Sequence, residues 1–202
     1  MTTARDLAIV AHDLTSERSV EQGDLSLVLA GAEVLDLAGA AALSLDGDRL
    51  SPHPRASTGD PLLDAAAAAL VRHQPYESVE DWLWRRGRGL SAAYVDDLER
   101  AGLTAPSRGR RIRRWTGRGE RPVDPAVRRG AEKRWAAGEP VLVALAFAAG
   151  LRDEPGEEVP ELVVEPVAAV LAAVGDAVQE LRAVRQRKLI EDAAFDNVWR
   201  GF

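Results

Sequence analysis

Arginine and tryptophan dominate the two stretches of this sequence whose side chains could bind an anion. The first stretch, WLWRRGRG, contains Arg85, Arg86 and Arg88. The second lies within residues 108–121, and its centre reads Arg110, Arg111, Arg113, Arg114 and Trp115. A guanidinium group binds phosphate through paired hydrogen bonds, and tryptophan favours the boundary between lipid headgroups and acyl chains. Nucleic acids are bound by the same residue types, so composition alone leaves both kinds of partner open.

The charge distribution indicates where an anionic partner would bind. The whole chain of 202 residues has a net charge of −6, with 24 arginines but only two lysines. Residues 108–134 hold eleven Lys or Arg against three Asp or Glu, a net charge of +8, so the rest of the chain carries −14. An acidic protein with one concentrated basic segment favours a local anionic partner, although a solvated loop remains the alternative. The arginine and alanine content also indicates a high-GC bacterial genome.

Several kinds of catalytic site are excluded or unsupported by the sequence. The absence of cysteine excludes disulfides, thiolate zinc sites and cysteine nucleophiles. His12, His53 and His73 lack the spacing of a metal motif, and neither a G-x-S-x-G turn nor a nucleotide-binding glycine loop occurs. We therefore expect no enzyme activity, no metal and no cofactor.

The hydropathy pattern predicts a cytoplasmic protein that meets membranes only at their surface. The start of the chain lacks the apolar segment of a secretory signal. The longest apolar run, residues 141–151, is shorter than the ~20 residues that span a bilayer.

The spacing of apolar residues predicts a mainly α-helical protein with two short β-hairpins, and a chain of 202 residues can form one large domain or two small ones. Helices are expected at residues 7–14, 24–37, 61–73, from 77–78 onward, 91–100, 125–137, 140–150 and from 166 onward. ALSLDGDRLSP predicts a hairpin that turns at Asp46-Gly47, and the arginine tract predicts a second, basic hairpin. The apolar run VLVALAFAAGL predicts a helix buried in the middle of the domain.

The stretch TGDPLLDAA has the residues of a helix N-terminus. Asp60 can accept hydrogen bonds from free backbone N–H groups, and Pro61 suits the first helical position. Gly59 permits a sharp turn before the helix, and Asp64 places a negative charge in its first turn. Local structure therefore accounts for the stretch without any chemistry.

The same stretch, Thr58 to Ala66, resembles the Thr-Gly-Asp-x-Leu-Leu-Asp-x-Ala signature of the Golgi phosphoprotein 3 family, which has many bacterial members. VLDLAGAAALSLDGDRL resembles the family's leucine-rich helix, glycine and hairpin, and ESVEDWL places Trp82 on a family tryptophan. The family next has a helix end, a hairpin and a turn. Their counterparts in this chain are DDLERAGLT, the arginine tract and RPVDP, in that order. VLVALAFAAGL lies where the family has its buried central helix. The resemblance covers roughly residues 5–190.

This resemblance implies a single, mainly α-helical domain over residues 1–202, a helical bundle around a buried apolar helix, in which the basic hairpin projects. It also implies a peripheral membrane protein that binds phosphatidylinositol 4-phosphate. The four pocket residues of eukaryotic members are a tryptophan and three arginines, and an ungapped alignment places them on Glu21, Ala30, Arg88 and Ser91. Only Arg88 matches in type. We expect Arg85, Arg86 and Arg88 to bind an anionic headgroup, while Arg110, Arg111, Arg113, Arg114 and Trp115 lie on the membrane.

Two other functions remain open at this stage. A helix followed by a basic hairpin is also the plan of a winged-helix nucleic-acid-binding protein, with residues 91–100 as its recognition helix. That helix offers Asp96, Asp97 and Glu99 against Arg100, which disfavours phosphate binding there. The second alternative is a protein–protein adaptor that has lost the lipid pocket. Self-association through the basic hairpin is a further expectation under either function.

Overall fold

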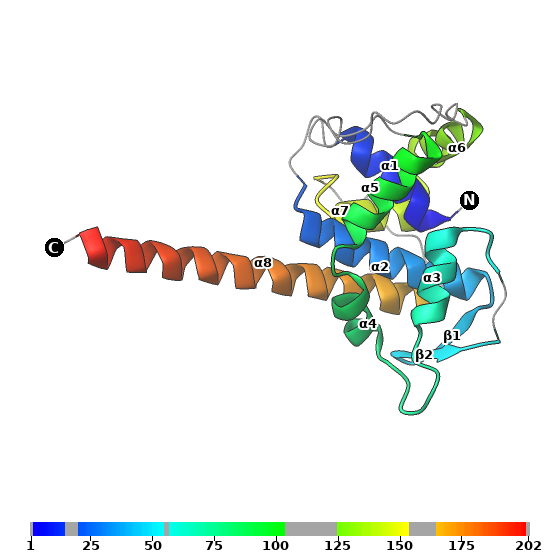
Figure 1. Cartoon of the computed structure of the whole chain (residues 1–202), viewed down its shortest axis with the longest axis horizontal. Helices are drawn as coiled ribbons and strands as arrows, with labels where there is room; N and C mark the ends of the chain where they lie inside the picture. The colour runs from blue at the N-terminus through cyan, green and yellow to red at the C-terminus, as the bar shows by residue number, and fades with distance from the viewer. Residues whose placement is uncertain (1, 15–19, 55–56, 104–124, 154–164, 201–202) are drawn as a thin grey trace, which may run out of the picture.

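The computed structural model describes residues 2–14, 20–54, 57–103, 125–153 and 165–200. The helices are α1 (Thr3–Leu14), α2 (Gln22–Gly39), α3 (Pro61–Ala69), α4 (Val79–Arg86), α5 (Leu90–Ala101), α6 (Pro125–Ala136), α7 (Pro140–Ala148) and α8 (Glu165–Arg200). The strands are β1 (Leu43–Asp46) and β2 (Arg49–Pro52). The predicted mainly helical class and the first hairpin are therefore confirmed (Figure 1). The second, basic hairpin lies outside the described residues.

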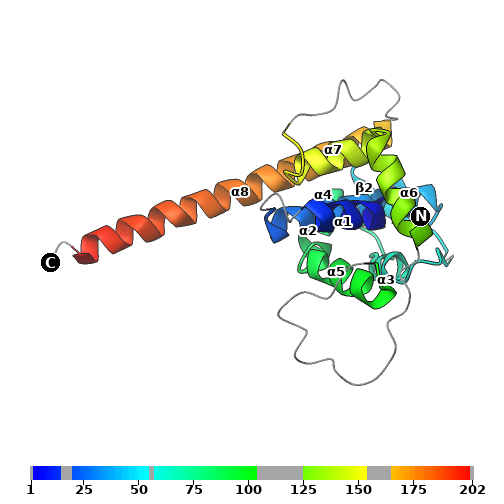
Figure 2. The same cartoon turned by 90° about the horizontal axis from the view of Figure 1, so that it is seen from above.

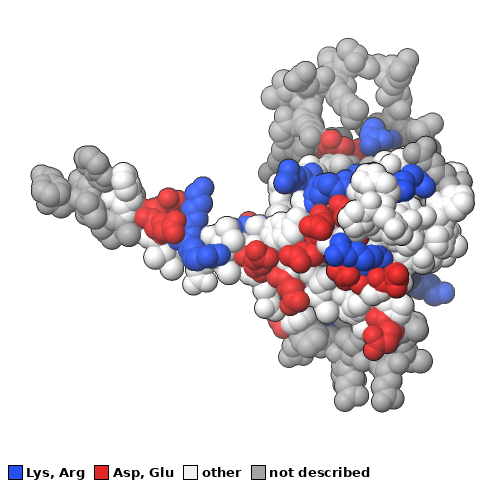
Figure 3. Space-filling model, turned by 90° about the horizontal axis from the view of Figure 1, so that it is seen from below, with Lys and Arg blue, Asp and Glu red and all other residues white. Residues whose placement is uncertain are grey.

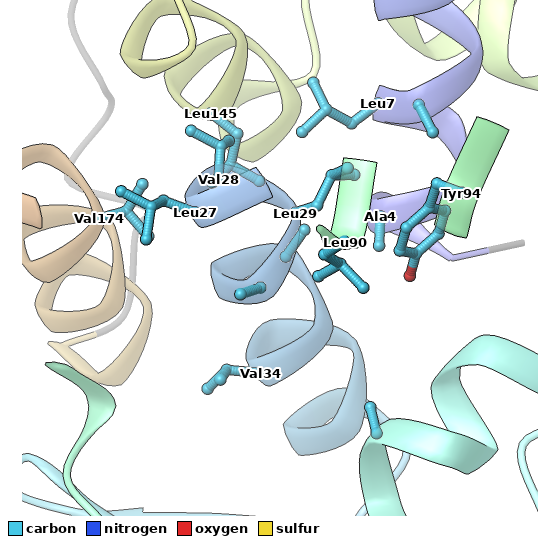
Figure 4. Close-up of a cluster of buried hydrophobic side chains, with 14 of the residues drawn as sticks. Ala4, Leu7, Leu27, Val28, Leu29, Val34, Leu90, Tyr94, Leu145 and Val174 are labelled. Carbon is cyan, nitrogen blue, oxygen red and sulfur yellow. The ribbon is translucent and has the colours of Figure 1, made fainter. Parts of the chain in front are cut away.

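Helix α2 forms the centre of the bundle. Its residues 24–34 are all buried, and it packs against α1, α4, α5, α7 and α8. Figure 4 shows apolar side chains of α1, α5, α7 and α8 around Leu27, Val28 and Leu29. Helix α2 is therefore buried on all sides, although its residues 24–34 include the carboxylates of Asp24 and Glu33.

The prediction that the run 140–150 forms the central buried helix is wrong. Helix α7 buries Leu142, Val143, Leu145 and Ala146, but Phe147 on its outer side is 41% exposed. Helix α7 covers α2 and α8 from one side (Figure 2). The hydrophobicity of residues 140–150 predicted that this helix is buried. It could not show that α2, and not α7, lies at the centre of the bundle.

The first hairpin turns one residue later than predicted. Strands β1 and β2 pair antiparallel with Asp46 opposite Arg49, so Gly47 and Asp48 form the two-residue turn. Gly47 has φ +61°, a conformation that glycine adopts without a steric penalty.

The N-terminus of α3 has the predicted cap. Asp60 accepts hydrogen bonds from the N–H groups of Leu62 and Leu63 at 2.9 and 3.2 Å, and Pro61 is the first helical residue. Asp64 turns back toward the preceding loop and accepts bonds from the Thr58 N–H at 2.7 Å and the Thr58 hydroxyl at 2.8 Å. These hydrogen bonds lower the pKa of the Asp64 carboxyl. They also give the family-like signature a structural role.

Helix α8 packs on the bundle only along its first half. The side chains buried along this half form one apolar stripe, which consists of Val170, Val174, Ala177 and Val178. Beyond Arg185 the helix leaves the bundle and projects away from it (Figures 1 and 2).

Candidate anion-binding site

A cleft lies where the N-termini of α2 and α5 meet the point at which α8 leaves the bundle. We call it the Arg88 cleft, and its volume is about 320 Å³. Its lining residues are Gln22, Gly23, Ser26, Leu27, Trp84, Gly87, Arg88, Gly89, Ser91, Ala92 and Leu181. It therefore combines segments from three distant parts of the sequence.

Two helix N-termini converge on this cleft. Neither the Glu21 side chain before α2 nor Gly89 before α5 caps its helix with a side-chain hydrogen bond. The first N–H groups of a helix carry a partial positive charge and bind anions. At α5, however, the Ser91 N–H is bonded to Ser26 Oγ at 3.1 Å and the Leu90 N–H to the Gly87 carbonyl oxygen at 3.3 Å. The start of α2 is therefore the helix end that can act beside Arg88.

Two serines hold these helix ends together. Ser26 Oγ lies 2.9 Å from Ser91 Oγ and accepts the Ser91 backbone N–H at 3.1 Å. Both hydroxyls also lie within hydrogen-bonding distance of the Gln22 carbonyl oxygen, at 2.7 and 3.2 Å. These bonds tie the start of α5 to the first turns of α2 beneath a cleft whose other lining residues include Leu27, Trp84 and Leu181.

The turn between α4 and α5 approaches α2 very closely. A Cβ atom on Gly87 would lie 2.5 Å from the Leu83 carbonyl oxygen and 3.4 Å from that of Ser26. Any side chain at this position would push the turn, and Arg88 with it, away from α2.

The charges around the cleft leave a positive balance at its inner end. Asp24, in the first turn of α2, would repel an anion, but its carboxylate is bound by Arg182 at 2.6 Å and by Arg185 at 2.5 Å. The Arg185 guanidinium lies against Gly23, since a Cβ atom there would come within 2.3 Å of it. Glu21 is exposed at the start of α2 and contributes the opposing charge.

The three arginines predicted to bind a headgroup have different environments. Arg86 is paired with buried Glu33 through two bonds of 2.8 Å. Arg85 donates two bonds of 2.6 Å to Glu77 and lies 5.2 Å from the centre of the Trp82 ring. Only Arg88 lines the cleft, and among the described residues it has neither an ion pair nor a side-chain hydrogen bond. The structure therefore does not bring the three guanidinium groups together at one site.

The remaining expected site residues fall in two places. The residues expected to lie on the membrane are outside the described part of the chain; they are Arg110, Arg111, Arg113, Arg114 and Trp115. Of the aligned pocket positions, Ser91 lines the cleft and Glu21 adjoins it, whereas Ala30 is fully buried and its carbonyl oxygen accepts a bond from Trp82 Nε1 at 3.1 Å.

Sequence reasoning missed Arg182 and Arg185, which are about 160 residues from their partner Asp24. The available signal was two arginines three residues apart, directly after the apolar stripe of a long helix. That spacing places them on one face beside the core.

Comparison with known proteins gives one result. The family model described as Golgi phosphoprotein 3 (GPP34) matches residues 4–192. No curated protein and no solved structure matches the chain.

Proposed function

Since the chain belongs to the Golgi phosphoprotein 3 (GPP34) family, we propose that it is a peripheral membrane protein that binds anionic phospholipid headgroups in the Arg88 cleft. The ligand is a phosphorylated headgroup, either phosphatidylinositol 4-phosphate or another anionic phospholipid. In this proposal the protein binds its ligand without chemical conversion.

The environment of Arg88 carries the proposal. Its guanidinium group is exposed in a cleft that also contains the N-terminus of α2, whereas Arg85 and Arg86 are committed to carboxylates. Neutralisation of Asp24 by Arg182 and Arg185 removes the charge that would otherwise repel a phosphate. Trp84 is half-buried at the same cleft and offers an aromatic surface at the height of the headgroups.

The arginine tract is the proposed second contact. Arg110, Arg111, Arg113 and Arg114 would lie on the anionic surface, each contributing ~1 kcal/mol when close to it, and Trp115 would enter the headgroup layer. Among the described helices, none combines the length and apolar character needed to cross a bilayer. We place the protein at the cytoplasmic face of a membrane.

The nucleic-acid alternative has less support from the described residues. Helix α5 turns Leu90, Tyr94 and Leu98 into the core, and its exposed Arg100 is bound to Asp97 at 3.1 Å. A recognition helix needs exposed cationic and base-reading groups.

A vesicle sedimentation panel tests the proposal. We expect binding to phosphatidylcholine vesicles that contain phosphatidylinositol 4-phosphate or phosphatidylglycerol, none to phosphatidylcholine alone, and weaker binding at high salt. The ratio between the two anionic lipids identifies the headgroup. Binding of a DNA duplex in place of vesicles would favour the nucleic-acid alternative, and capture of a protein partner without vesicle binding would favour an adaptor.

Matched variants locate the binding site on the protein. Arg88→Ala should weaken vesicle binding about fivefold to tenfold, because one charge-assisted contact is lost. Glu21→Gln should strengthen it, because an opposing charge is removed next to the cleft. Arg129→Ala removes an exposed arginine from α6 and serves as the control. Equal binding by Arg88→Ala and Arg129→Ala would reject the cleft as the headgroup site.

A further inference from the structure

The last described part of α8 is a helix surrounded by solvent. Its residues 186–193 are all exposed, and Arg185 is the last residue with a described contact to the bundle, through Asp24. We call residues 184–195 the C-terminal arm. Figures 1 and 2 show from two directions that it projects away from the other helices.

This arm holds most of the exposed large hydrophobic side chains of the described chain. The large hydrophobic side chains exposed among the described residues number five, and four of them belong to the arm: Val184 at 45%, Leu189 at 70%, Ile190 at 62% and Phe195 at 63%. A solitary helix of this length has little stability of its own in water. A binding partner on the side of Val184 and Phe195 would cover these two residues and stabilise the helix.

Four arm residues form a single seam. Val184, Lys188, Glu191 and Phe195 are separated by four, three and four residues, the spacing that aligns side chains along one face of a helix in a coiled coil. The two ends of the seam are apolar, and its centre holds one cation and one anion.

We propose that the C-terminal arms of two copies of this chain pair antiparallel along this seam. In that arrangement Val184 packs against Phe195 of the second copy, and Lys188 lies opposite its Glu191. Twofold symmetry repeats both contacts, so the seam is complementary to itself. A parallel arrangement would instead place Lys188 against Lys188 and Glu191 against Glu191.

Charge separation along the arm supports the antiparallel direction. Arg185, Arg187 and Lys188 precede Glu191 and Asp192. Figure 3 shows the resulting blue group followed by a red group toward the C-terminus. Only an antiparallel neighbour places the basic part of each arm next to the acidic part of the other.

A second copy fits the arm better than a lipid surface. Viewed along the helix axis, Leu189 and Ile190 are rotated by about 120–140° from Val184, in opposite directions. They therefore lie on the other side of the helix. The apolar residues therefore do not form the single broad face with which a helix enters a membrane interface. The pairing rests on the arm alone and not on the proposed headgroup site.

Sedimentation equilibrium of the full chain tests the pairing. We expect a reversible dimer at concentrations of about 10–100 μM, since a seam this short buries less than a standard interface. Lys188→Glu and Glu191→Lys should each weaken association at least about tenfold, because each opposes like charges. Lys133→Glu makes the same change on α6 and should leave association unchanged.

Two recombinations of these variants, compared with the weakened single variants, test whether residue 188 of one copy faces residue 191 of the other. An equimolar mixture of Lys188→Glu and Glu191→Lys proteins should dimerise, and the double variant Lys188→Glu/Glu191→Lys should regain wild-type association. Circular dichroism and thermal unfolding would show that every variant is folded. A monomeric wild type at 0.1 mM and above, or a double variant as weak as the single variants, would overturn the proposal.

Discussion

Arg85 and Arg86 are neighbours in the sequence, but their ion pairs lie in different environments. The Arg85 side chain is 44% exposed, whereas Arg86 binds Glu33, whose side chain is fully buried. Tyr94 also donates a hydrogen bond to Glu33 at 3.2 Å. The Glu77 side chain is 8% exposed, so Arg85 also pairs with a largely buried carboxylate, but Arg85 itself is more exposed than Arg86. Removal of either arginine leaves a carboxylate uncompensated, and the cost is larger where both partners are buried. Arg86 therefore stabilises the fold, although its sequence context indicated a ligand-binding residue.

The first residue-scale prediction concerns Arg86→Ala. We expect the free energy of unfolding at pH 7 to fall by about 3–5 kcal/mol, and by less in Arg85→Ala, because Arg85 is the more exposed of the two arginines. Denaturant titration of the two variants and the wild type would measure both differences.

The loss of unfolding free energy caused by Arg86→Ala should depend on pH. Burial raises the pKa of the Glu33 carboxyl above 4.5, and the bonds from Arg86 oppose that rise. Without Arg86 the pKa rises further, so the ionised carboxylate destabilises the fold above that pKa and the protonated form relieves the penalty below it. The stability difference from wild type should shrink as the pH falls from 7 toward about 5. A loss that stays constant with pH would show that Glu33 is not its cause.

The residues around Asp60 show what local sequence can predict. The cap by Asp60, the helical start at Pro61 and the turn at Gly59, with φ +77°, were all predicted, because each depends on neighbours within a few positions. The buried partners of Arg86 and Asp24 were not predicted. Those pairs join residues 53 to 161 positions apart, and only packing brings them together.

At the scale of helices, the close packing of α2 against α8 depends on the absence of a side chain at Gly31. A Cβ atom on Gly31 would lie 2.3 Å from a γ-methyl group of Val174, which is itself fully buried. Glycine inside a helix normally costs about 1 kcal/mol relative to alanine, so its presence here is explained by the close approach of the two helices.

This contact gives a prediction for paired variants. Gly31→Ala should lower the free energy of unfolding by about 1–3 kcal/mol, because it overpacks the α2–α8 interface. In a Val174→Ala background the same change should be neutral or stabilising, since the space is then available. A double-mutant cycle measured by chemical denaturation would give the coupling. The same loss in both backgrounds would contradict the contact.

At the scale of elements, apolar spacing predicted the position of most helices but not their environment. It predicted a helix at residues 61–73, yet α3 ends at Ala69, and it predicted a central helix at 140–150, where α7 is peripheral. Apolar residues show that a helix must be covered, but its neighbours depend on the packing of the whole chain.

For the whole molecule, the candidate site is a product of tertiary structure. Gln22, Arg88 and Leu181 are far apart in sequence and line one cleft. The sequence pointed to Arg88 through the resemblance to Golgi phosphoprotein 3 proteins. It could not show that Arg85 and Arg86 point to other partners, or that Arg182 and Arg185 neutralise Asp24 beside the cleft.

The central claim is that the Arg88 cleft binds a phosphorylated headgroup, and backbone amide NMR tests it most directly. Soluble short-chain phosphatidylinositol 4-phosphate, titrated below its micelle concentration, should cause saturable shifts centred on Gln22, Gly23 and Gly89, and Arg88→Ala should abolish them. Shifts that are absent, that map to another surface, or that persist unchanged in Arg88→Ala would contradict the account.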